Sequence, residues 1–159
     1  MSVDDLMESN SMRWKRFFQE RASRTDIDGY RVNGFIDSVL VDTIHNSVRK
    51  LLTRYRYEIV FDCGCGDGSV TSPLTFFGIK VFGLDFSPLM CLRAERQGLI
   101  PIESDLTTLQ NHDLFDYCGH SSRQPYGCIL FCESLGCIDN PLLFLSSLLR
   151  SNAESTDLI

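Results

Sequence analysis

The sequence lacks a surplus of basic residues, a long apolar run and any internal repeat. Its 15 lysines and arginines are outnumbered by 21 aspartates and glutamates, which leaves a net charge of −6. A nucleic-acid partner is disfavoured, because binding the phosphate backbone requires a basic surface. No stretch approaches the roughly 18 consecutive apolar residues of a membrane span, and the acidic opening MSVDDLMESN is not a signal peptide. We expect a cytoplasmic protein with no nucleic-acid and no membrane partner.

Paired cysteine knuckles of the C-x2–4-C type are also missing. The seven cysteines are an odd number, and most of them lie inside apolar runs, where thiols act as small buried hydrophobes rather than as disulfides. Cys63 and Cys65 form a C-x-C pair with His112 and His120 downstream, but this spacing is not that of a zinc site. We expect reduced cysteines and no metal.

A cluster of glycines is present, but the lysine that a P-loop would need is missing. Three glycines alternate within VFDCGCGDGSV, residues 60–70: Gly64, Gly66 and Gly68. A P-loop needs G-x-x-x-x-G-K-[ST], and residues 57–79 contain no lysine, so a nucleoside triphosphate is disfavoured. A dinucleotide site needs G-x-G-x-x-G, whose third position falls on Ser69. A nicotinamide-dinucleotide domain therefore stays a weak alternative.

Helical and strand patterns alternate along the chain. The predicted elements are a helix over 12–22, a helix from about 33, a strand over 57–62, a helix over 69–77, a strand over 79–85, a helix over 87–98, a strand over 99–104, a strand over 126–132 and a helix over 141–150. Such alternation predicts an α/β fold, with a Rossmann-like parallel sheet, flanking helices and right-handed crossovers. We expect a polar, helical extension over 1–32, one domain over 33–151 and a loose tail over 152–159.

Three acids follow three of the predicted strands. Asp62, Asp85 and Asp105 should meet at one edge of the sheet, because the carboxyl ends of parallel strands lie together, and ligands bind there. An acid after the second strand can accept hydrogen bonds from ribose hydroxyls, and an ionised carboxylate is only an acceptor. These acids favour an adenosine that carries an amino group and a positive charge over one that carries pyrophosphate.

Four segments in order carry a family resemblance. VFDCGCGDGSV resembles motif I, D-x-G-x-G-x-G, of the class I S-adenosylmethionine-dependent methyltransferases. VFGLDFSPLMCLRA, ESDLTTL and YGCILFCESLGCIDNPLLFLSSLLR resemble that family's later motifs, and together the segments cover about residues 34–150. The resemblance implies a methyltransferase with S-adenosylmethionine as cofactor. The cofactor-binding residues it implies are Asp62, Cys63, Gly64, Cys65, Gly66, Gly68, Asp85, Phe86, Asp105 and Leu106.

The resemblance also implies roles for these residues. The glycines would wrap the methionine part of the cofactor with Asp62 near its amino group, and Asp85 would hold the ribose hydroxyls. Asp105 would accept from the adenine amine, and the backbone of Leu106 would lie near the ring. Methyl transfer is a direct displacement that needs alignment. Glu133, after the fourth strand, is the candidate general base.

Weaker candidates complete the set. His112, Asp113 and His120 precede the fourth strand and could transfer a proton, and Tyr30 with Arg31 could close over the cofactor. Nothing in the sequence names the acceptor, although the acidic balance favours a small molecule.

The sequence departs from this family at its C-terminal end. The family fold has three further strands after the last predicted helix, and here only SNAESTDLI follows. A truncated enzyme, a chain completed by a partner and a non-catalytic cofactor-binding module are the alternatives, of which we favour truncation. The fourth strand, YGCILFC, would then be an open apolar edge. We therefore expect a homodimer or aggregate to form through this strand.

Overall fold

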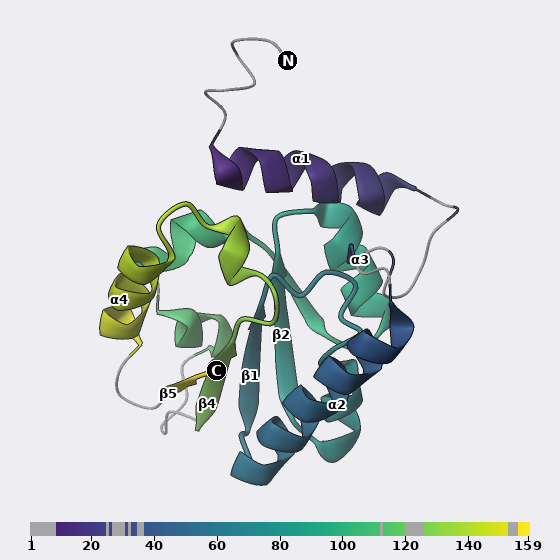
Figure 1. Ribbon diagram of the computed structural model, residues 1–159. Helices are drawn as coiled ribbons and strands as arrows, with labels where there is room; N and C mark the ends of the chain where they lie inside the picture. Colours follow the sequence, from purple (N-terminus) through teal and green to yellow (C-terminus); the bar gives the residue numbers. More distant parts are fainter. Residues whose placement is uncertain are drawn as a thin grey trace, which may run out of the picture.

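A parallel five-stranded sheet forms the centre of the protein (Figure 1). The computed structural model describes residues 9–24, 26, 31, 33–34, 37–111, 113–119, 126–152 and 156–159. The strands are β1 (Ile59–Cys63), β2 (Lys80–Asp85), β3 (Ile100–Glu103), β4 (Gly127–Leu130) and β5 (Thr156–Leu158). Their order across the sheet is β3-β2-β1-β4-β5, and every neighbouring pair is parallel. The chain therefore changes direction across the sheet between β1 and β4, which is where such folds bind ligands.

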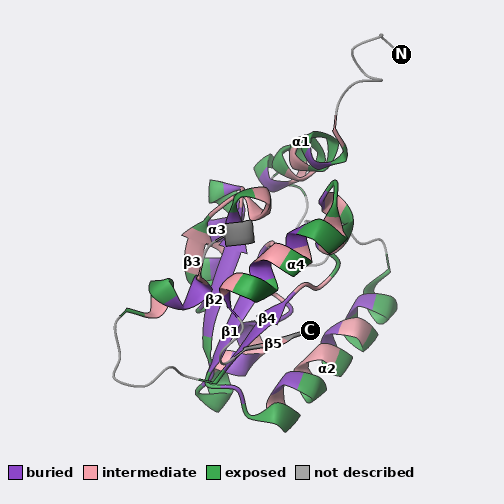
Figure 2. Ribbon diagram, turned by 90° about the vertical axis from the view of Figure 1, so that its left-hand side faces the viewer, coloured by how far each residue is buried: buried purple, intermediate pink, exposed green. Residues whose placement is uncertain are grey.

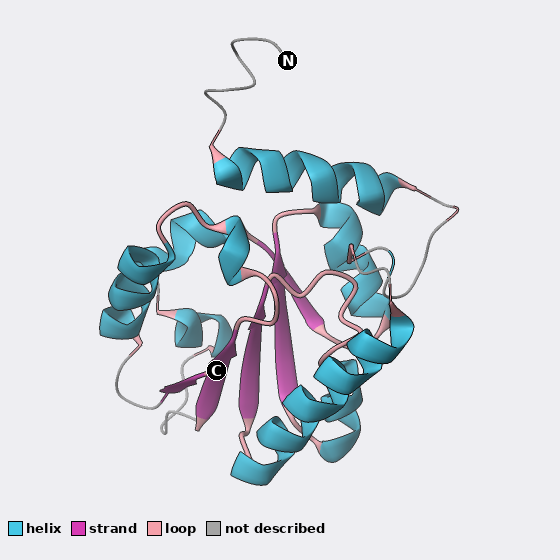
Figure 3. Ribbon diagram, viewed as in Figure 1, coloured by secondary structure: helices cyan, strands magenta, loops and turns pink. Residues whose placement is uncertain are grey.

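Helices cover both faces of the sheet and one of its ends (Figure 3). The α-helices are α1 (Asn10–Ser23), α2 (Ser38–Tyr55), α3 (Pro88–Arg96) and α4 (Pro141–Ser151). Short 3-10 helices are η3 (Ser72–Phe77), η4 (Leu106–Asn111), η5 (Leu114–Cys118) and η6 (Leu135–Cys137). In Figure 1, α1 lies across the carboxyl ends of the strands. It contacts α3 on one side and η6 on the other.

The sheet separates two apolar layers, and its central strands are buried throughout (Figure 2). Side chains alternate along β1, because successive residues of a strand point to opposite faces. Phe61 packs with side chains of η4, η5 and α4, whereas Val60 packs with side chains of α2, η3 and α3. Both residues are fully shielded from solvent. This double coverage explains why residues 59–61 of β1 are apolar without alternation.

The helix boundaries follow local signals in the sequence. Asp37 caps α2 by accepting from the backbone N–H groups of Val39 and Leu40, at 2.8 and 3.1 Å. Ser87 caps α3, and Pro88 occupies the first turn, where its missing N–H is not needed. The predicted start of this helix near residue 33 is therefore early by a few residues, because α2 begins only after the cap at Asp37.

The predicted fold class is confirmed, and two local predictions are corrected. The helix expected over 69–77 is only the 3-10 helix η3, since Pro73 cannot donate the backbone hydrogen bond that an α-helix would need. The segment between β3 and β4, for which no helix or strand was predicted, contains η4 and η5. Both 3-10 helices supply apolar side chains to the core, and Leu109 and Leu114 are fully buried.

The tail expected to be loose forms the strand β5, which corrects the prediction of an open fourth strand. Residues 156–158 pair in parallel with residues 127–129 of β4. The hydroxyl groups of Tyr57 and Tyr126 both donate to the carboxylate of Asp157, at 2.8 and 2.5 Å. These bonds secure the tail beside β4, so the premise for a homodimer through this strand is removed.

Within the described ranges, no helix is both long enough and apolar enough to cross a lipid bilayer.

Candidate functional site

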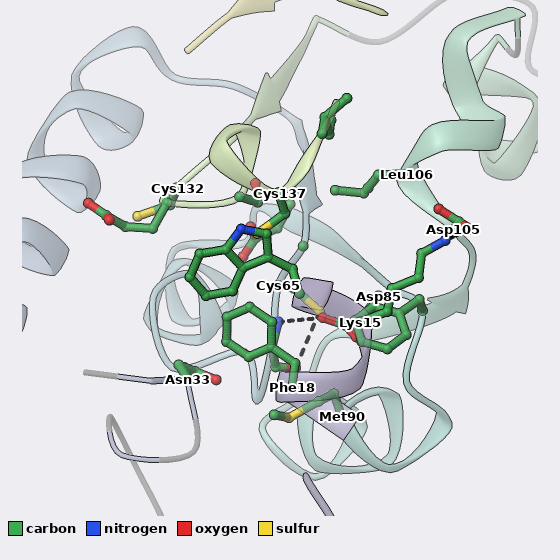
Figure 4. A pocket seen from close by; sticks show the side chains of 18 of the residues that line it. Lys15, Phe18, Asn33, Cys65, Asp85, Met90, Asp105, Leu106, Cys132 and Cys137 are labelled. Atoms are coloured by element: carbon green, nitrogen blue, oxygen red, sulfur yellow. Dashed lines mark hydrogen bonds and ion pairs between the residues drawn. The ribbon is translucent and has the colours of Figure 1, made fainter. Parts of the chain in front are cut away.

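One pocket lies at the carboxyl ends of the strands and is roofed by α1 (Figure 4). It brings together residues from the glycine loop, from the ends of β2 and β3, from the turn after β4 and from α1. Its lining includes Trp14, Lys15, Phe18, Asn33, Asp62, Gly64, Cys65, Gly66, Met90, Asp85, Phe86, Asp105, Leu106, Thr107, Cys132, Glu133, Ser134, Cys137 and Ile138. Most of the predicted site residues are therefore neighbours in space, although the sequence separates them widely.

The glycine loop has a backbone that side chains would disturb. Gly64 has φ +81°, and a Cβ there would lie 2.5 Å from the Cβ of Ser134. Gly66 has φ +55°, and a Cβ there would overlap the amide of Asn33. That amide donates to the carboxylate of Asp67 at 2.8 Å, while its oxygen accepts from the N–H of Asp67 at 3.2 Å. The glycines thus serve close packing within the protein as well as access for a ligand.

Asp85 is held rigidly at the end of β2. Its carboxylate accepts from the backbone N–H of Gly66 at 3.1 Å and from that of Ser87 at 2.9 Å. Only 7% of the residue is exposed, and burial raises its pKa to about 6 although the backbone hydrogen bonds oppose this shift. A carboxylate so placed favours a ligand that brings hydrogen-bond donors, because these would offset the cost of its burial.

Asp62 lies deeper, at the end of β1. The hydroxyl of Thr71 donates to its carboxylate at 2.6 Å. Burial, with smaller contributions from the charges of Asp85 and Asp67, raises its pKa to about 7. A cationic group in the pocket would stabilise the ionised form of Asp62, so the residue suits the position of a ligand ammonium.

Asp105 differs from the other two acids because a protein cation already contacts it. The ammonium of Lys15 forms an ion pair with one carboxylate oxygen. The other oxygen accepts from the backbone N–H and the hydroxyl of Thr107, at 3.0 and 2.8 Å. Partial burial acts to raise the pKa of Asp105, but the hydrogen bonds from Lys15 and Thr107 outweigh it and hold the pKa below its ordinary value.

The turn after β4 joins the site at the switch point of the sheet. Glu133 has φ +64°, which is uncommon for a residue other than glycine, and its side chain is exposed. The hydroxyl of the next residue, Ser134, donates to the backbone carbonyl of Cys63 at 2.5 Å. This bond ties the turn to the end of β1. A carboxylate is thereby presented at the rim of the pocket.

Helix α1 supplies the apolar roof. The rings of Trp14 and Phe18 stack with centroids 5.7 Å apart and an interplanar angle of 24°, and both residues line the pocket. Near the start of the helix, the side-chain amide of Asn10 donates to the carbonyl of Gly136 at 2.8 Å. Near the other end of the helix, the guanidinium of Arg93 donates to the carbonyl of Arg24 at 3.3 Å. The position of α1 therefore depends on bonds at both ends, on its aromatic face and on Lys15.

Two predicted cofactor residues do not line this pocket. The thiol of Cys63 packs in the apolar layer beneath η4 and α4, and Gly68 lies against the backbone of Ala94 in α3. Cys65, by contrast, does reach the pocket. The two thiols of the C-x-C pair therefore lie in different apolar layers, because β1 ends at Cys63 and the chain turns at Gly64, which has φ +81°.

Of the weaker candidates, the two that the structure describes, Asp113 and Arg31, do not line the pocket. Asp113 caps η5 by accepting from the N–H of Phe115 at 2.9 Å. The carbonyl of Arg31 accepts from the guanidinium of Arg21. His112, His120 and Tyr30 lie outside the described residues. The part of the chain that is described contains no group of three His, Cys, Asp or Glu side chains placed to hold a metal ion.

The lining residues that were not foreseen include Trp14, Lys15, Phe18 and Asn33. The expected function of the first helix was to cover an edge of the core, and Asn33 was only the expected start of the second helix. Trp14 and Phe18 are four residues apart and so share one helix face. That spacing is the one sequence signal that could have pointed to them.

Comparison with known proteins assigns this arrangement to a family profile. Residues 61–150, more than half of the chain, match the profile described as "Methyltransferase domain". No curated protein sequence matches the chain significantly.

Several solved structures share the fold. Magnesium protoporphyrin IX methyltransferase from Synechocystis PCC 6803, solved with bound SAM, is 18% identical, with a TM-score of 0.59 over 91% of this chain and 73% of that one. The N-methyltransferase NodS from Bradyrhizobium japonicum WM9, in complex with S-adenosylhomocysteine, is 12% identical, with a TM-score of 0.61 over 91% of this chain and 68% of that one. The plantazolicin methyltransferase BamL is 22% identical, with a TM-score of 0.52, and the chain spans only 44% of its length.

Proposed function

The chain belongs to the methyltransferase-domain family, and on that premise we propose that it transfers a methyl group from S-adenosylmethionine to a small molecule. The observation that carries this proposal is the position of Asp85. Its carboxylate is nearly buried, is fixed by two backbone N–H groups and borders the same pocket as the glycine loop. That arrangement fits a ribose with two adjacent hydroxyl donors.

The remaining residues fit the other parts of the cofactor. Asp62 would lie near the amino group, whose positive charge would offset the cost of ionising a buried acid. The backbone at Gly64 and Gly66 would lie against the methionine part. Asp105 and Leu106 would contact the adenine. When bound, the cofactor supplies a methyl group on a positively charged sulfur, which is open to direct displacement.

The protein's contribution to that displacement is alignment. The glycine loop and the turn after β4 meet through the hydrogen bond from Ser134 to Cys63, so they fix the two sides of the reacting centre. Glu133 stands at the rim with an exposed carboxylate. We assign it the role of general base for an acceptor that must lose a proton.

An acceptor with an apolar body suits this pocket best. The lining of the pocket includes the apolar side chains of Trp14, Phe18 and Ile138. Several similar structures act on small molecules by their printed names, among them the protoporphyrin methyltransferase. The net charge of −6 also favours such an acceptor over a nucleic acid.

A cytoplasmic location is part of the same proposal. None of the seven cysteines forms a disulfide, and burial raises the pKa of the thiols of Cys65 and Cys128. Such thiols stay protonated and unreactive. This pattern suits a reducing compartment.

Calorimetry with S-adenosylmethionine, S-adenosylhomocysteine and NADH tests the proposal. Binding of the two sulfur ligands without binding of NADH is expected. If NADH binds and the others do not, the dinucleotide alternative replaces the methyltransferase. Tight binding without methyl transfer to a broad panel of apolar acceptors would instead identify a non-catalytic cofactor-binding module.

A further inference from the structure

The ion pair between Lys15 and Asp105 joins the roof of the pocket to its floor. Lys15 comes from α1 and Asp105 from the turn after β3, 90 residues later in the chain. Figure 4 shows the Lys15 side chain directed at the Asp105 carboxyl group across the pocket wall. Three acids that follow strands line the pocket: Asp62, Asp85 and Asp105. Within the described residues, Asp105 is the one of these three that forms an ion pair with a side chain.

The two oxygens of Asp105 are not equivalent. Oδ1 is bound within its own turn by the N–H and hydroxyl of Thr107. Oδ2 takes the ammonium of Lys15. The side chains of Lys15 and Asp105 are 34% and 31% exposed, so the pair lies at the rim and an incoming group can reach it. A ligand amine that binds Asp105 must therefore share or displace Lys15 at Oδ2, since a carboxylate can only accept.

Lys15 sits between two residues of the aromatic roof. Trp14 precedes it, and Phe18 lies one helical turn further along. Moving Lys15 away from Asp105 therefore moves the aromatic wall of the pocket as well. Near the first turn of α1, Asn10 and Ser11 bond to Gly136 and Asp139. At its other end, the guanidinium of Arg93 donates to the backbone carbonyl of Arg24 at 3.3 Å. Lys15 bonds to the floor of the pocket between these two ends of the helix.

We propose that Lys15 is a positioning residue, which holds α1 over the pocket by pairing with Asp105 and is displaced by the adenine amino group of the cofactor. This inference rests on the proposed function. Cofactor binding then shifts the Trp14–Phe18 wall, so that the acceptor side of the pocket is reshaped only when the cofactor is present. The ion pair between Lys15 and Asp105 would thereby make the cofactor bind before the acceptor.

Variants at position 15 test this coupling through cofactor affinity. Lys15→Met removes the competitor, so S-adenosylhomocysteine should bind about two- to fivefold more tightly, as expected for a partly exposed ion pair. Lys15→Arg should restore the wild-type affinity, because its guanidinium can also pair with Asp105. Arg13→Met is the matched control. It removes one positive charge from the same helix, and Arg13 does not line the pocket.

Salt provides a second readout that a merely structural role of Lys15 would not change. Screening weakens an exposed ion pair. Raising the ionic strength from roughly 0.05 to 0.5 M should therefore tighten ligand binding in the wild type more than in Lys15→Met. Equal affinities and equal salt dependence in the two proteins would overturn the proposal, as would weaker binding by Lys15→Met.

Trp14 reports the position of α1 directly, because it is the only tryptophan in the chain. Quenching of its fluorescence by acrylamide should increase in ligand-free Lys15→Met, and it should change in the wild type when S-adenosylhomocysteine binds. If no variant binds this ligand, the proposed function fails. The ligand-free comparison then decides the contact by itself: increased quenching in Lys15→Met supports the closed roof, and equal quenching overturns it.

Discussion

The floor and the roof of the pocket are built by different means. The floor is the glycine loop with the ends of β1 and β2, where Asp62 and Asp85 are nearly buried and bonded to backbone or hydroxyl groups. The roof is α1, where Trp14 is 38% exposed and Lys15 forms a rim ion pair. The family profile covers most of the floor but not the roof. The two regions therefore differ in burial and in their relation to the family. One scaffold can keep its cofactor contacts in the floor while the roof, on the acceptor side, varies.

Loss of Asp85 should cause the largest change, because the floor carries most of the cofactor affinity. Asp85→Ala removes charge-assisted hydrogen bonds worth roughly 1.5–3 kcal/mol each, so the affinity for S-adenosylhomocysteine should fall at least tenfold in calorimetry. Glu103→Ala is the control, since Glu103 pairs with Asp85 in register on β3 and is exposed. Similar effects of both changes would show that general charge, rather than the ribose contact, determines binding.

A side chain in the glycine loop should disturb the floor even without a ligand. Gly64→Ala brings a Cβ to within 2.5 Å of Ser134 at a positive φ, and we expect the free energy of unfolding to fall by about 2–3 kcal/mol. Gly78→Ala is the matched control, because Gly78 has φ +78° with no atom within 4 Å of the added Cβ. It should cost about 1 kcal/mol from backbone strain alone. Equal losses in denaturant titrations would mean that close packing against Ser134 is unimportant.

The buried acid Asp62 should make the ligand-free floor less stable as the pH rises. Its pKa is raised by burial to about 7 in the folded protein, so the folded state binds the proton more tightly than the unfolded chain does. The favourable contribution is complete below pH ~4 and is lost as the pH rises through ~7.

Asp62→Asn should remove this dependence. A pKa difference of one corresponds to about 1.4 kcal/mol. Because the pKa rises from 3.8 to about 7, we expect the variant to gain on the order of 4 kcal/mol over the wild type between pH ~4 and ~8. Chemical denaturation across that range measures the gain. Parallel stability curves for the two proteins would exclude a neutral Asp62 in the folded state.

Weakening the roof should have the smallest effect on global stability. The side chain of Ser9 caps α1 by accepting from the N–H of Met12 at 3.2 Å. Ser9→Ala should destabilise α1 by about 1 kcal/mol and speed hydrogen exchange of its amides, while exchange in β1 stays unchanged. If exchange in β1 rose equally, α1 would be part of the same cooperative unit as the floor.

The sequence alone predicted the floor well. The buried strand before Asp62, the Ser87-Pro88 helix start and the acids after successive strands are local signals with a direct physical cause, and together they imply one edge of a parallel sheet. The α/β class was predicted from such signals and the methyltransferase family from the resemblance of four segments to its motifs, and both are confirmed. Whether each acid holds its assigned part of the cofactor stays a prediction.

Tertiary structure decided the roof and the open edge of the sheet. Nothing local to Lys15 indicates that it meets Asp105, because the contact joins residues 90 positions apart. The polar tail carries only a weak strand signal, and its pairing with β4 depends on where Tyr57 and Tyr126 present their hydroxyls to Asp157. The spacing of apolar residues and the positions of turn-forming residues determine which helices and strands form. Which distant surfaces then come into contact depends on packing in three dimensions, which no short stretch of sequence contains.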